Sequence, residues 1–355
     1  MDVIIIGGGV GGLSVAAHLA PHASVTLLEA EAATGYHASG RSAALFDTSY
    51  GHPTSVELNK ASQPFHHAAG VLSPRGLMVV ADTNSTRAFA TDCEVMGLAP
   101  ITVDEALFKM PILRADRVAQ AGYHAEAWDI DTHELMMHFT RTARRNGAQI
   151  VTKAAATAIT RVSSKWQVTT AVGGLRADII VNAAGAWADK VAEMAGVAPL
   201  GITPLRRSMA RLPAPGGQDV SGWPMTLGAG ETWYAKPDAG SLLVSPADQE
   251  PCAPMDAWPD DMVLAEGLAR YEAMVTQPVT RVDASWAGLR SFTPDRAMAI
   301  GFDPAEPGFF WHAGQGGSGF QTAPAAGKLA AALIAGHAPD IPDDLVAALS
   351  PHRFR

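Results

Sequence analysis

The sequence predicts an α/β protein built on a parallel sheet, and three similar segments support this prediction. Residues 3–6 are four consecutive β-branched residues, which is typical of a strand buried on both faces of a parallel sheet. A glycine-rich turn and an apolar segment follow directly. Residues 177–187 and 309–322 repeat the order of an apolar strand and then a turn of small residues. Such repeats indicate strands of one sheet connected by helices.

The first glycine turn has the spacing of a dinucleotide-binding loop. Gly7, Gly9 and Gly12 form G-x-G-x-x-G between the first strand and an expected helix. In this motif the first glycine makes the turn, the second lets the backbone approach a pyrophosphate and the third permits close helix packing. A second strand, residues 24–28, ends in Glu29, which is placed to accept hydrogen bonds from ribose hydroxyls. The segment therefore predicts dinucleotide binding.

The two later segments favour a cofactor longer than a nicotinamide dinucleotide. The strand expected at 179–181 breaks into a turn of small residues that ends at Gly185. The aromatic strand that begins at Phe309 leads into GQGGSG, a helix is expected over about 324–335, and Gly336 is well placed to end it. Small residues in such turns let a large ligand lie against bare backbone.

Five segments of the chain together resemble one family. They are the opening motif, TGYHASGRSAA at 34–44, NAAGAW at 182–187, WAGLRSFTPD at 286–295 and GQGGSGFQT at 314–322. In this order they resemble FAD-dependent D-amino acid oxidases and dehydrogenases, with bacterial D-arginine dehydrogenases the most similar in appearance. The resemblance covers nearly the whole chain. It implies an α/β fold with a discontinuous Rossmann-like FAD-binding domain, of the glutathione-reductase type, beside a β-rich α+β substrate domain.

The resemblance also implies how the chain is divided between the two domains. Residues 1–72, 131–203 and 284–355 are expected to form the FAD-binding domain. Residues 73–130 and 204–283 are expected to form the substrate-binding domain.

Two local patterns locate elements inside these domains. The sequence from Asp131 to Glu134 predicts a capping box that starts a helix ended by Gly147. Strand-like residues at 232–236 and 241–244, separated by Pro-Asp-Ala-Gly, predict a β-hairpin.

Composition and charge exclude several classes of partner. The chain has 355 residues with 48% hydrophobic content, enough for a large core, and a formal net charge of −9. It has no block rich in lysine and arginine, so binding to nucleic acid or to an anionic membrane is not expected. The apolar run at 329–335 is far shorter than the roughly 20 residues that span a bilayer. With only Cys93 and Cys252 and no metal-ligand spacing, the sequence predicts a cytoplasmic protein without a metal site.

The expected cofactor is FAD, held without a covalent bond. Neither cysteine falls in the C-terminal cofactor segment, where some amine oxidases of the superfamily attach flavin to a thiol. The resemblance implies that the cofactor is surrounded by Gly7, Gly9, Gly12, Glu29, Ser39, Gly40, Arg41, Ser42, Ala156, Ala183, Gly185, Trp187, Gly314, Gly316, Ser318, Gly319, Gln321 and Thr322.

A carboxylate clamp for an amino-acid substrate is also implied by the resemblance. Arg290 supplies a planar guanidinium, which can bind a carboxylate through two hydrogen bonds, and Tyr234 donates to the same carboxylate. Tyr50 and Arg207 fall on family positions near the substrate. The carbonyl of Gly317 is expected to meet the substrate amine.

The implied reaction is oxidative deamination. Hydride passes from the α-carbon to the flavin as the ammonium group loses a proton, and water hydrolyses the imine to a 2-oxo acid and ammonia. A quinone, another carrier or oxygen then accepts the electrons. No general base is evident: His37 and His312 flank cofactor loops, and Asp47 is a weaker candidate. Whether Arg206 or Arg207 faces the substrate stays open.

The side-chain end of the pocket departs from the arginine-using members of the family. Leu77 stands where those enzymes have a glutamate for the substrate guanidinium, and Leu45 stands where they have a histidine. Burying an unpaired guanidinium against two leucines costs several kcal/mol. With Leu45, Asp47 and Leu77 at this end, the sequence predicts oxidation of neutral, apolar D-amino acids or of a small cyclic secondary amine.

Three alternatives use the same motifs. An N-methyl or cyclic amino acid, glycine or a 2-hydroxy acid shares carboxylate recognition and hydride transfer. A flavin-carrying, non-catalytic subunit of a larger redox complex keeps the FAD motifs but does not need the clamp of Arg290 and Tyr234. A nicotinamide-dependent dehydrogenase needs the first glycine turn alone.

Overall fold

Strand β1 (Asp2–Ile6) lies in the interior of a six-stranded sheet. The other strands of this sheet are β2 (Ser24–Leu28), β9 (Gln149–Val151), β13 (Ile179–Asn182), β20 (Ala299–Phe302) and β21 (Phe309–Ala313). In the computed structural model, which describes residues 1–355, the strand order is β20-β21-β13-β1-β2-β9. Neighbouring strands are parallel except β20 and β21. The parallel sheet predicted from the sequence is confirmed.

The β-branched residues of β1 are buried on both faces of this sheet, because alternate side chains of a strand point to opposite faces. Ile5 shares a core cluster with α1 (Val10–Leu19) and α8 (Gly319–Ala335). Ile6 shares a different cluster with Trp166, on the opposite face. Trp166 belongs to a three-stranded antiparallel sheet of β10 (Ala156–Val162), β11 (Lys165–Thr170) and β12 (Gly173–Ala177).

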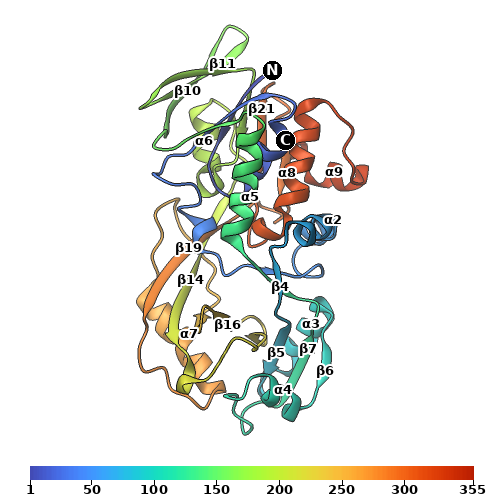
Figure 1. The fold of residues 1–355 in the computed structure, drawn as a ribbon, viewed down its shortest axis with the longest axis vertical. Helices are drawn as coiled ribbons and strands as arrows, with labels where there is room; N and C mark the ends of the chain where they lie inside the picture. Colours follow the sequence, from blue (N-terminus) through green and yellow to red (C-terminus); the bar gives the residue numbers. More distant parts are fainter.

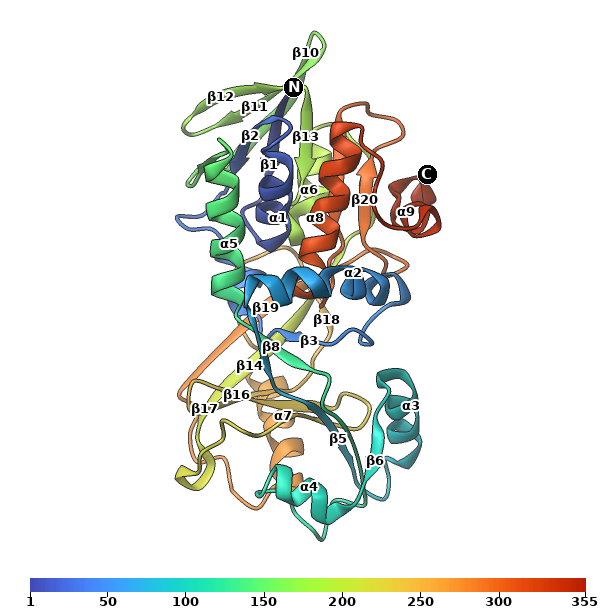
Figure 2. The same cartoon turned by 45° about the vertical axis from the view of Figure 1, so that its right-hand side comes forward.

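Helices cover the face of the six-stranded sheet on which Ile5 lies. Figure 2 shows α5 (Thr132–Arg145), α1 and α8 side by side, with α2 (Pro53–Ala69) running across their lower ends. Two shorter helices, α6 (Ala188–Met194) and α9 (Asp343–Leu349), lie beside the sheet. None of the helices combines the length and the apolar character needed to cross a membrane.

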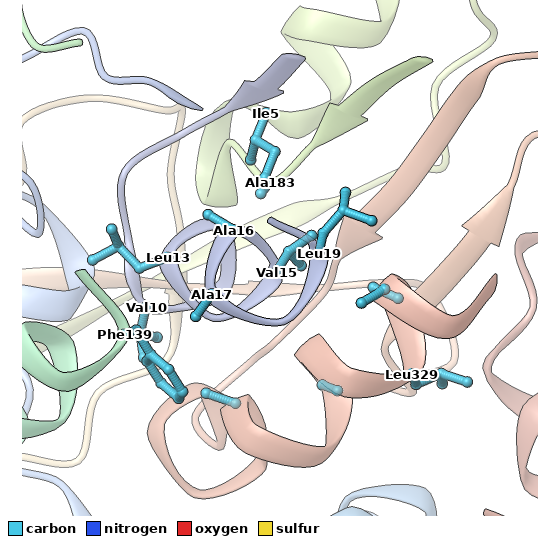
Figure 3. Close-up of a cluster of buried hydrophobic side chains, with 14 of the residues drawn as sticks. Ile5, Val10, Leu13, Val15, Ala16, Ala17, Leu19, Phe139, Ala183 and Leu329 are labelled. Carbon is cyan, nitrogen blue, oxygen red and sulfur yellow. The ribbon is translucent and has the colours of Figure 1, made fainter. Parts of the chain in front are cut away.

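Helices α1 and α8 are in close contact. A Cβ on Gly327 would lie 2.1 Å from the hydroxyl oxygen of Ser14, so only glycine fits there. The Ser14 hydroxyl in turn donates to the carbonyl of Ala323 at 2.5 Å. Figure 3 shows α1 in the middle of the apolar cluster, with Ile5 on one side and Leu329 on the other. This packing holds α1 and α8 in fixed positions relative to each other and to the sheet.

A nine-stranded sheet forms the other half of the molecule, drawn below in Figure 1. Its strands are β5 (Leu77–Ala81), β6 (Ala99–Ile101), β7 (Gln120–His124), β14 (Thr203–Pro213), β15 (Met225–Gly228), β16 (Trp233–Asp238), β17 (Ser241–Ser245), β18 (Glu250–Pro251) and β19 (Ala284–Phe292). The order is β18-β14-β17-β16-β15-β5-β7-β6, and β19 pairs with β14. The helices of this half are α3 (Thr86–Met96), α4 (Val103–Lys109) and α7 (Asp261–Met274).

The two halves are joined through several segments. A small antiparallel sheet of β3 (Leu45–Phe46), β8 (Trp128–Ile130) and β4 (Leu72–Pro74) lies between them. Strands β14 and β19 also run from one half towards the other (Figure 1). The domain boundaries inferred from the sequence stay a prediction.

The predicted hairpin forms between β16 and β17. Asp238 lies opposite Ser241, so the loop consists of Ala239 and Gly240 alone. These two residues have φ values of 47° and 77°. Two positive φ angles in a two-residue loop are those of a type I′ turn, whose twist matches the flanking strands.

The capping box predicted at the start of α5 is only half formed. The Asp131 carboxylate accepts a hydrogen bond from the Glu134 N–H at 2.8 Å. The Glu134 carboxylate pairs with Arg141 instead of returning to the backbone of Asp131. A reciprocal box does form at α4, between Thr102 and Glu105.

The start predicted for the last helix was wrong. Helix α8 begins at Gly319, and Pro324 lies inside it. A proline inside a helix leaves a carbonyl of the preceding turn without its N–H partner. Helix α2 binds the groups next to that carbonyl: His66 Nε2 lies 2.9 Å from the carbonyl of Gln321, and the Ser62 hydroxyl donates to the carbonyl of Thr322 and accepts from the N–H of Ala325. The local sequence holds no information about these side chains from a distant helix.

Candidate active site

A cavity of about 620 Å³ lies between the two large sheets. It is lined by the first glycine turn, by the ends of β2 and β13, by the turn before α8 and by side chains of the nine-stranded sheet. Ligand pockets commonly have volumes of roughly 300 to 1,000 Å³. In open α/β sheets, ligands bind beyond the carboxyl ends of the parallel strands, which is where this cavity begins.

The first glycine turn lets the backbone of β1 approach β13. Gly7 has a φ of 113°, and a Cβ on it would lie 2.4 Å from the carbonyl oxygen of Ala183. A Cβ on Gly12 would lie 2.0 Å from the Gly7 carbonyl oxygen, so Gly12 permits helix packing and does not itself line the cavity. Gly9 lines the cavity directly. The N-terminus of α1, with its free N–H groups and partial positive charge, therefore faces the cavity.

Glu29 lies at the end of β2 and is 8% exposed. One of its oxygens accepts a hydrogen bond from the N–H of Gly8 at 2.7 Å, and the other accepts from the N–H of Glu31 at 2.8 Å. A carboxylate has about four lone-pair sites, so both oxygens can accept a further bond. Both oxygens of Glu29 therefore keep lone pairs for the ribose hydroxyls, and ribose binding stays a prediction.

The loop that contains HASGRSAA is held over the cavity by polar contacts. The Ser39 hydroxyl accepts from the N–H of Val10, at the start of α1, at 3.0 Å. The Arg41 guanidinium donates to the carbonyls of Ala257 and Ala287 at 2.8 and 2.9 Å. These bonds connect the loop to the glycine turn on one side and to β19 on the other.

The two histidines flanking the cofactor loops lie in different environments. His37 lines the cavity, with its ring centroid 4.6 Å from that of Trp187. His312 is fully buried and does not line the cavity. Burial lowers the pKa of His312 to about 4, so its imidazole is neutral at ordinary pH.

The C-terminal glycine segment brings the backbone against Arg290. The N–H of Gly316 donates to the carbonyl of Ser291 at 2.8 Å, which connects this segment to the end of β19. A Cβ on Gly317 would lie 2.9 Å from the guanidinium carbon of Arg290. Residue 317 must therefore lack a side chain for Arg290 to take its position.

Arg207 and Arg290 face the cavity from neighbouring strands. Arg207 of β14 lies opposite Gly288 of β19, two residues before Arg290. Opposed residues and every second residue along a strand share one face, so both guanidinium groups lie on the same face of the sheet. Arg206 does not line the cavity and pairs with Glu250 at 2.6 Å. The choice between the two neighbouring arginines therefore falls on Arg207.

Neither of these two guanidinium groups forms an ion pair, although the Glu231 carboxylate lines the same cavity. Arg207 donates through Nε to the backbone carbonyl of Asp248 at 2.9 Å, while its Nη2 has no partner. Neither Arg207 nor Arg290 takes part in an ion pair within the chain. Burial, followed by the positive charge of Arg290, lowers the pKa of Arg207 from its usual value. The negative charge of Glu231 acts in the opposite direction on Arg207, but two guanidinium groups beside one carboxylate keep a net positive charge, which favours binding of an anion.

Two tyrosines lie beside these arginines. The ring of Tyr234 lies 5.8 Å from the guanidinium carbon of Arg207. The Tyr50 hydroxyl donates to Glu231 at 2.7 Å. Burial, followed by the negative charge of Glu231, raises the pKa of Tyr50, so its hydroxyl keeps its proton at neutral pH. Sequence reasoning missed Glu231, because a glutamate after a glycine in a turn looks like an ordinary surface residue.

A row of cavity-lining residues runs from Tyr234 across the sheet. Tyr234 lies opposite Leu227, and Met225 of the same strand lies beside Leu77. Leu45 of β3 also lines the cavity. The tyrosine and arginines thus stand at one end of this wall, and the two leucines stand near the other.

A buried polar pair adjoins the two leucines. Asp47 is 1% exposed and lines the cavity. One of its oxygens accepts from the backbone and hydroxyl of Ser49, and the other lies 3.0 Å from His124 Nε2. His124 lies opposite Leu77 on the neighbouring strand. Nothing near Asp47 in the sequence points to His124, because only strand pairing brings the two together.

Most of the residues named from the sequence line the cavity. Gly40 packs on the backbone of Gly35, and Thr322 donates to the carbonyl of Ser318; with Gly12, Gly314 and Ser318 itself, they lie behind the cavity surface. Those that line it are Gly7, Gly9, Glu29, Ser39, Arg41, Ser42, Leu45, Asp47, Tyr50, Leu77, Ala156, Ala183, Gly185, Trp187, Arg207, Tyr234, Arg290, Gly316, Gly317, Gly319 and Gln321.

The fold and this cavity define a dinucleotide-binding protein whose ligand site continues into a pocket lined by two guanidinium groups. The chain belongs to the DAO family of FAD dependent oxidoreductases, whose family model matches residues 2–333. Its cofactor is therefore FAD. The glycine turn without side chains, the helix N-termini and the free lone pairs of Glu29 fit the pyrophosphate and ribose of this cofactor.

Relatives with known activities are similar over different shares of the chain. Glycine oxidase of Geobacillus kaustophilus is 26% identical over 360 residues, which are 94% of this chain and 92% of that protein. Human mitochondrial dimethylglycine dehydrogenase is 29% identical over 225 residues, which are 55% of this chain but only 24% of that longer protein. The structure of L-proline dehydrogenase from P. horikoshii has a TM-score of 0.83 at 23% identity, covering 99% of this chain and 97% of that one. A likeness at this identity shows a common fold.

Proposed function

We propose that the protein oxidises neutral D-amino acids to 2-oxo acids and ammonia with FAD as the oxidant. One observation carries this proposal: Arg207 and Arg290 face the cofactor cavity, and neither forms an ion pair with a carboxylate of the chain. The carboxylate of an amino acid supplies that partner, and guanidinium groups bind it with directional hydrogen bonds. The preference for the D-enantiomer rests on the family resemblance of the motifs around these residues.

The chain's part in the reaction begins with the substrate carboxylate. Arg290 and Tyr234 hold it, and Arg207 adds a second positive charge from the same sheet face. Tyr50 keeps its hydroxyl proton, so the hydroxyl can donate to the substrate once it no longer donates to Glu231. Fixing one end of the substrate in this way makes hydride transfer effectively unimolecular, because the loss of translational and rotational entropy has already occurred on binding.

The amine end of the substrate lies next to the glycine segment in this proposal. The carbonyl of Gly317, directly beside Arg290, accepts a hydrogen bond from the substrate amine and orients the α-carbon. FAD, when bound, supplies the chemistry of hydride acceptance. The apolar wall of Leu227 and Met225 keeps water from the reacting atoms until the product imine meets solvent and is hydrolysed. A quinone, another carrier or oxygen then takes the electrons.

The side-chain end of the cavity sets the preference for uncharged substrates. Leu45 and Leu77 offer no counter-charge to a guanidinium, and the Asp47 carboxylate is already next to His124. A long cationic side chain would therefore lose its hydration without gaining a full ion pair.

A second candidate is oxidation of glycine or of an N-substituted or cyclic amino acid. The proteins to which the chain is similar include a glycine oxidase, a dimethylglycine dehydrogenase and an L-proline dehydrogenase. All of these substrates carry the carboxylate that the arginine pair would bind. What distinguishes the candidates is the presence of a side chain and of an N-substituent.

The test is anaerobic mixing of the purified protein with D- and L-amino acids, glycine, sarcosine, dimethylglycine and proline, followed by the visible absorbance of the flavin. Bleaching by neutral D-amino acids, but not by L-forms or D-arginine, supports the proposal. Bleaching by the N-substituted or cyclic compounds alone transfers the assignment to the second candidate. Bleaching by none, with FAD bound, favours a non-catalytic flavin-carrying subunit.

Two further features belong to the same proposal. FAD is held without a covalent bond, because neither Cys93 nor Cys252 lines the cavity. Acid precipitation should therefore release all of the flavin into the supernatant. Both cysteines are free thiols, which suits a reducing cytoplasm.

A further inference from the structure

Asp248 does not line the cavity, yet it binds two consecutive residues of β14, one of which does. It is 9% exposed. One carboxylate oxygen accepts from the N–H of Ser208 at 2.6 Å, and the other accepts from the Ser208 hydroxyl at 2.8 Å. The backbone carbonyl of Asp248 accepts from Arg207 Nε at 2.9 Å. Asp248 therefore holds Arg207 through its main chain and the next residue of β14 through its side chain.

The irregular segment that contains Asp248 lies between β17 and β18, which both pair with β14. Val244 lies opposite Ala210 of β14, and Glu250 lies opposite Arg206. Six residue steps on this side thus oppose four on β14, so the segment forms a bulge with two extra residues. The bulge takes the backbone of Asp248 out of the regular ladder, which frees its carbonyl to bind an arginine side chain.

Side-chain hydrogen bonds support the conformation of this bulge. Ala247 has a φ of 55°, a left-handed conformation that residues with a Cβ rarely adopt. Its N–H donates to the hydroxyl oxygen of Ser245 at 3.1 Å, and this hydroxyl donates to the carbonyl of Ser208 at 2.7 Å. Both serines are fully buried. The Asp248 carboxylate makes two further bonds to Ser208, so its loss should let the bulge relax.

These bonds determine which nitrogens of Arg207 remain for a ligand. Its Nε is bound to Asp248, whereas its buried Nη2 has no partner. A guanidinium presents its donors in a rigid planar fork, so fixing Nε also orients the two terminal nitrogens. An arginine that is already ordered loses less side-chain entropy when a ligand binds. Arg207 is therefore preorganised, with its terminal nitrogens left for an anion.

We propose that Asp248 is a positioning residue, which holds Arg207 in the orientation that receives the substrate carboxylate. This inference rests on the function proposed above and adds to it a residue that does not itself touch the substrate. Loss of the Asp248 side chain should weaken carboxylate binding, because Arg207 must then be ordered when the substrate binds. The hydride-transfer step should change little, because Arg290, Tyr234 and the cofactor half are unaltered.

The central measurement is a double-mutant cycle of Asp248→Ala and Arg207→Met in the full-length, FAD-loaded protein. The readouts are KM and kcat for the best amino-acid substrate, and the Kd of pyruvate, a carboxylate without an amine, from titration calorimetry. Asp248→Ala alone should raise KM and Kd by roughly 5- to 10-fold and change kcat by less than about twofold. Added to Arg207→Met, it should change either constant by less than about twofold. Equal factors in both backgrounds would overturn the inference.

Asp248→Asn separates hydrogen bonding from charge. The side-chain oxygen of asparagine can accept from the Ser208 N–H, and its NH2 group can donate to the Ser208 hydroxyl. KM and Kd should therefore stay within about twofold of those of the unmodified protein. If Asp248→Asn loses as much as Asp248→Ala, the charge of Asp248 and not its bonds is what matters, and the inference is wrong.

The matched control is Asp303→Ala, which removes another buried carboxylate. Asp303 is 4% exposed and accepts from the Ala305 N–H and the Trp311 indole, but it does not line the cavity. Its loss should lower the melting temperature and leave KM for the amino acid and Kd for pyruvate unchanged. If both variants raise KM and Kd by the same factor, Asp248 acts only through general stability and the inference fails.

FAD content and melting temperature show whether each variant is folded. If Asp248→Ala does not fold, Ser208→Ala takes its place in the cycle, because it removes one of the two bonds to the carboxylate. It should raise Kd by roughly two- to fivefold, with the same dependence on Arg207.

The two readouts also separate this inference from the proposed function. If no amino acid is oxidised but pyruvate binding follows the expected cycle, the proposed function fails and the positioning role stands. If amino acids are oxidised and Asp248→Ala changes neither KM nor Kd, the positioning role fails and the proposed function stands. If the unmodified protein neither binds pyruvate nor oxidises an amino acid, both fail.

Discussion

The two halves of the cavity are built in different ways. Towards the six-stranded sheet its wall is backbone: Gly7 and Ala183 approach so closely that a single added Cβ would lie 2.4 Å from a carbonyl oxygen. Towards the nine-stranded sheet its wall is side chains, with Arg207 and Tyr234 projecting from adjacent parts of the sheet. The cofactor half therefore depends on glycines that have no side chain, whereas the substrate half depends on which functional groups its side chains carry.

This difference has a consequence for mutation. In the cofactor half, adding one carbon disrupts the fold around the ligand, because the interior is close-packed. In the substrate half, a changed side chain leaves the sheet intact and alters recognition. Folding and FAD content should therefore report on the first half, and substrate ratios on the second.

The largest effect is expected for Gly7→Ala. The new Cβ would meet the Ala183 carbonyl oxygen at 2.4 Å, at a φ of 113° that alanine rarely adopts. Overpacking and backbone strain together cost about 3 kcal/mol or more. The purified variant should contain little or no FAD, measured by the ratio of visible to ultraviolet absorbance. Gly222→Ala is the control, since no atom lies within 4 Å of its added Cβ; full FAD content in Gly7→Ala would contradict the close approach.

A large but purely kinetic effect is expected for Arg290→Met. Removing the guanidinium that faces the cavity should lower kcat/KM for the best substrate by roughly 100- to 1,000-fold. FAD content should stay unchanged, because the cofactor half is intact. Arg206→Met is the matched control, as its guanidinium pairs with Glu250 outside the cavity. Equal losses in both variants would argue against a clamp at Arg290.

A change of specificity is expected for Leu77→Glu. The new carboxylate would stand on the cavity wall beside Met225, where it can pair with a cationic side chain. The kcat/KM for D-arginine should rise about tenfold relative to that for D-leucine. Val95→Glu adds the same charge on an exposed surface and should change nothing. An unchanged preference in Leu77→Glu would place Leu77 outside the substrate's reach.

The smallest expected effect is on the pH dependence of stability, and it comes from His66 in the cofactor half. Burial lowers the pKa of His66 to about 4, against 6.5 in an unfolded chain. Between these values the unfolded state binds more protons, so stability falls as pH falls from about 6.5 to about 4. His66→Gln can keep the bond to the Gln321 carbonyl without titrating. It should reduce the acid-induced loss of melting temperature by a few degrees, whereas His133→Gln, at an exposed position, should not. Parallel pH curves for His66→Gln and the unmodified protein would remove His66 as the cause.

Local sequence was a good guide in the cofactor half and a weaker one in the substrate half. The strand, turn and helix at residues 2–19 form as predicted, because each depends on neighbours within a few positions. The start of α8 was wrong, since Ser62 and His66 of a distant helix support the turn around Pro324. Glu231 was missed for a related reason: its role is visible only through the Tyr50 hydroxyl.

The sequence by itself determined the parallel sheet, the glycine turns and hence the FAD family of this protein. These follow from β-branched runs and from the absence of side chains at fixed spacings, which are properties of short segments. Only the tertiary structure decided that Arg207, not Arg206, faces the cavity, and that His124 stands beside Asp47. Strand pairing makes both decisions, because a shift of one residue in register would turn every side chain to the other face of the sheet.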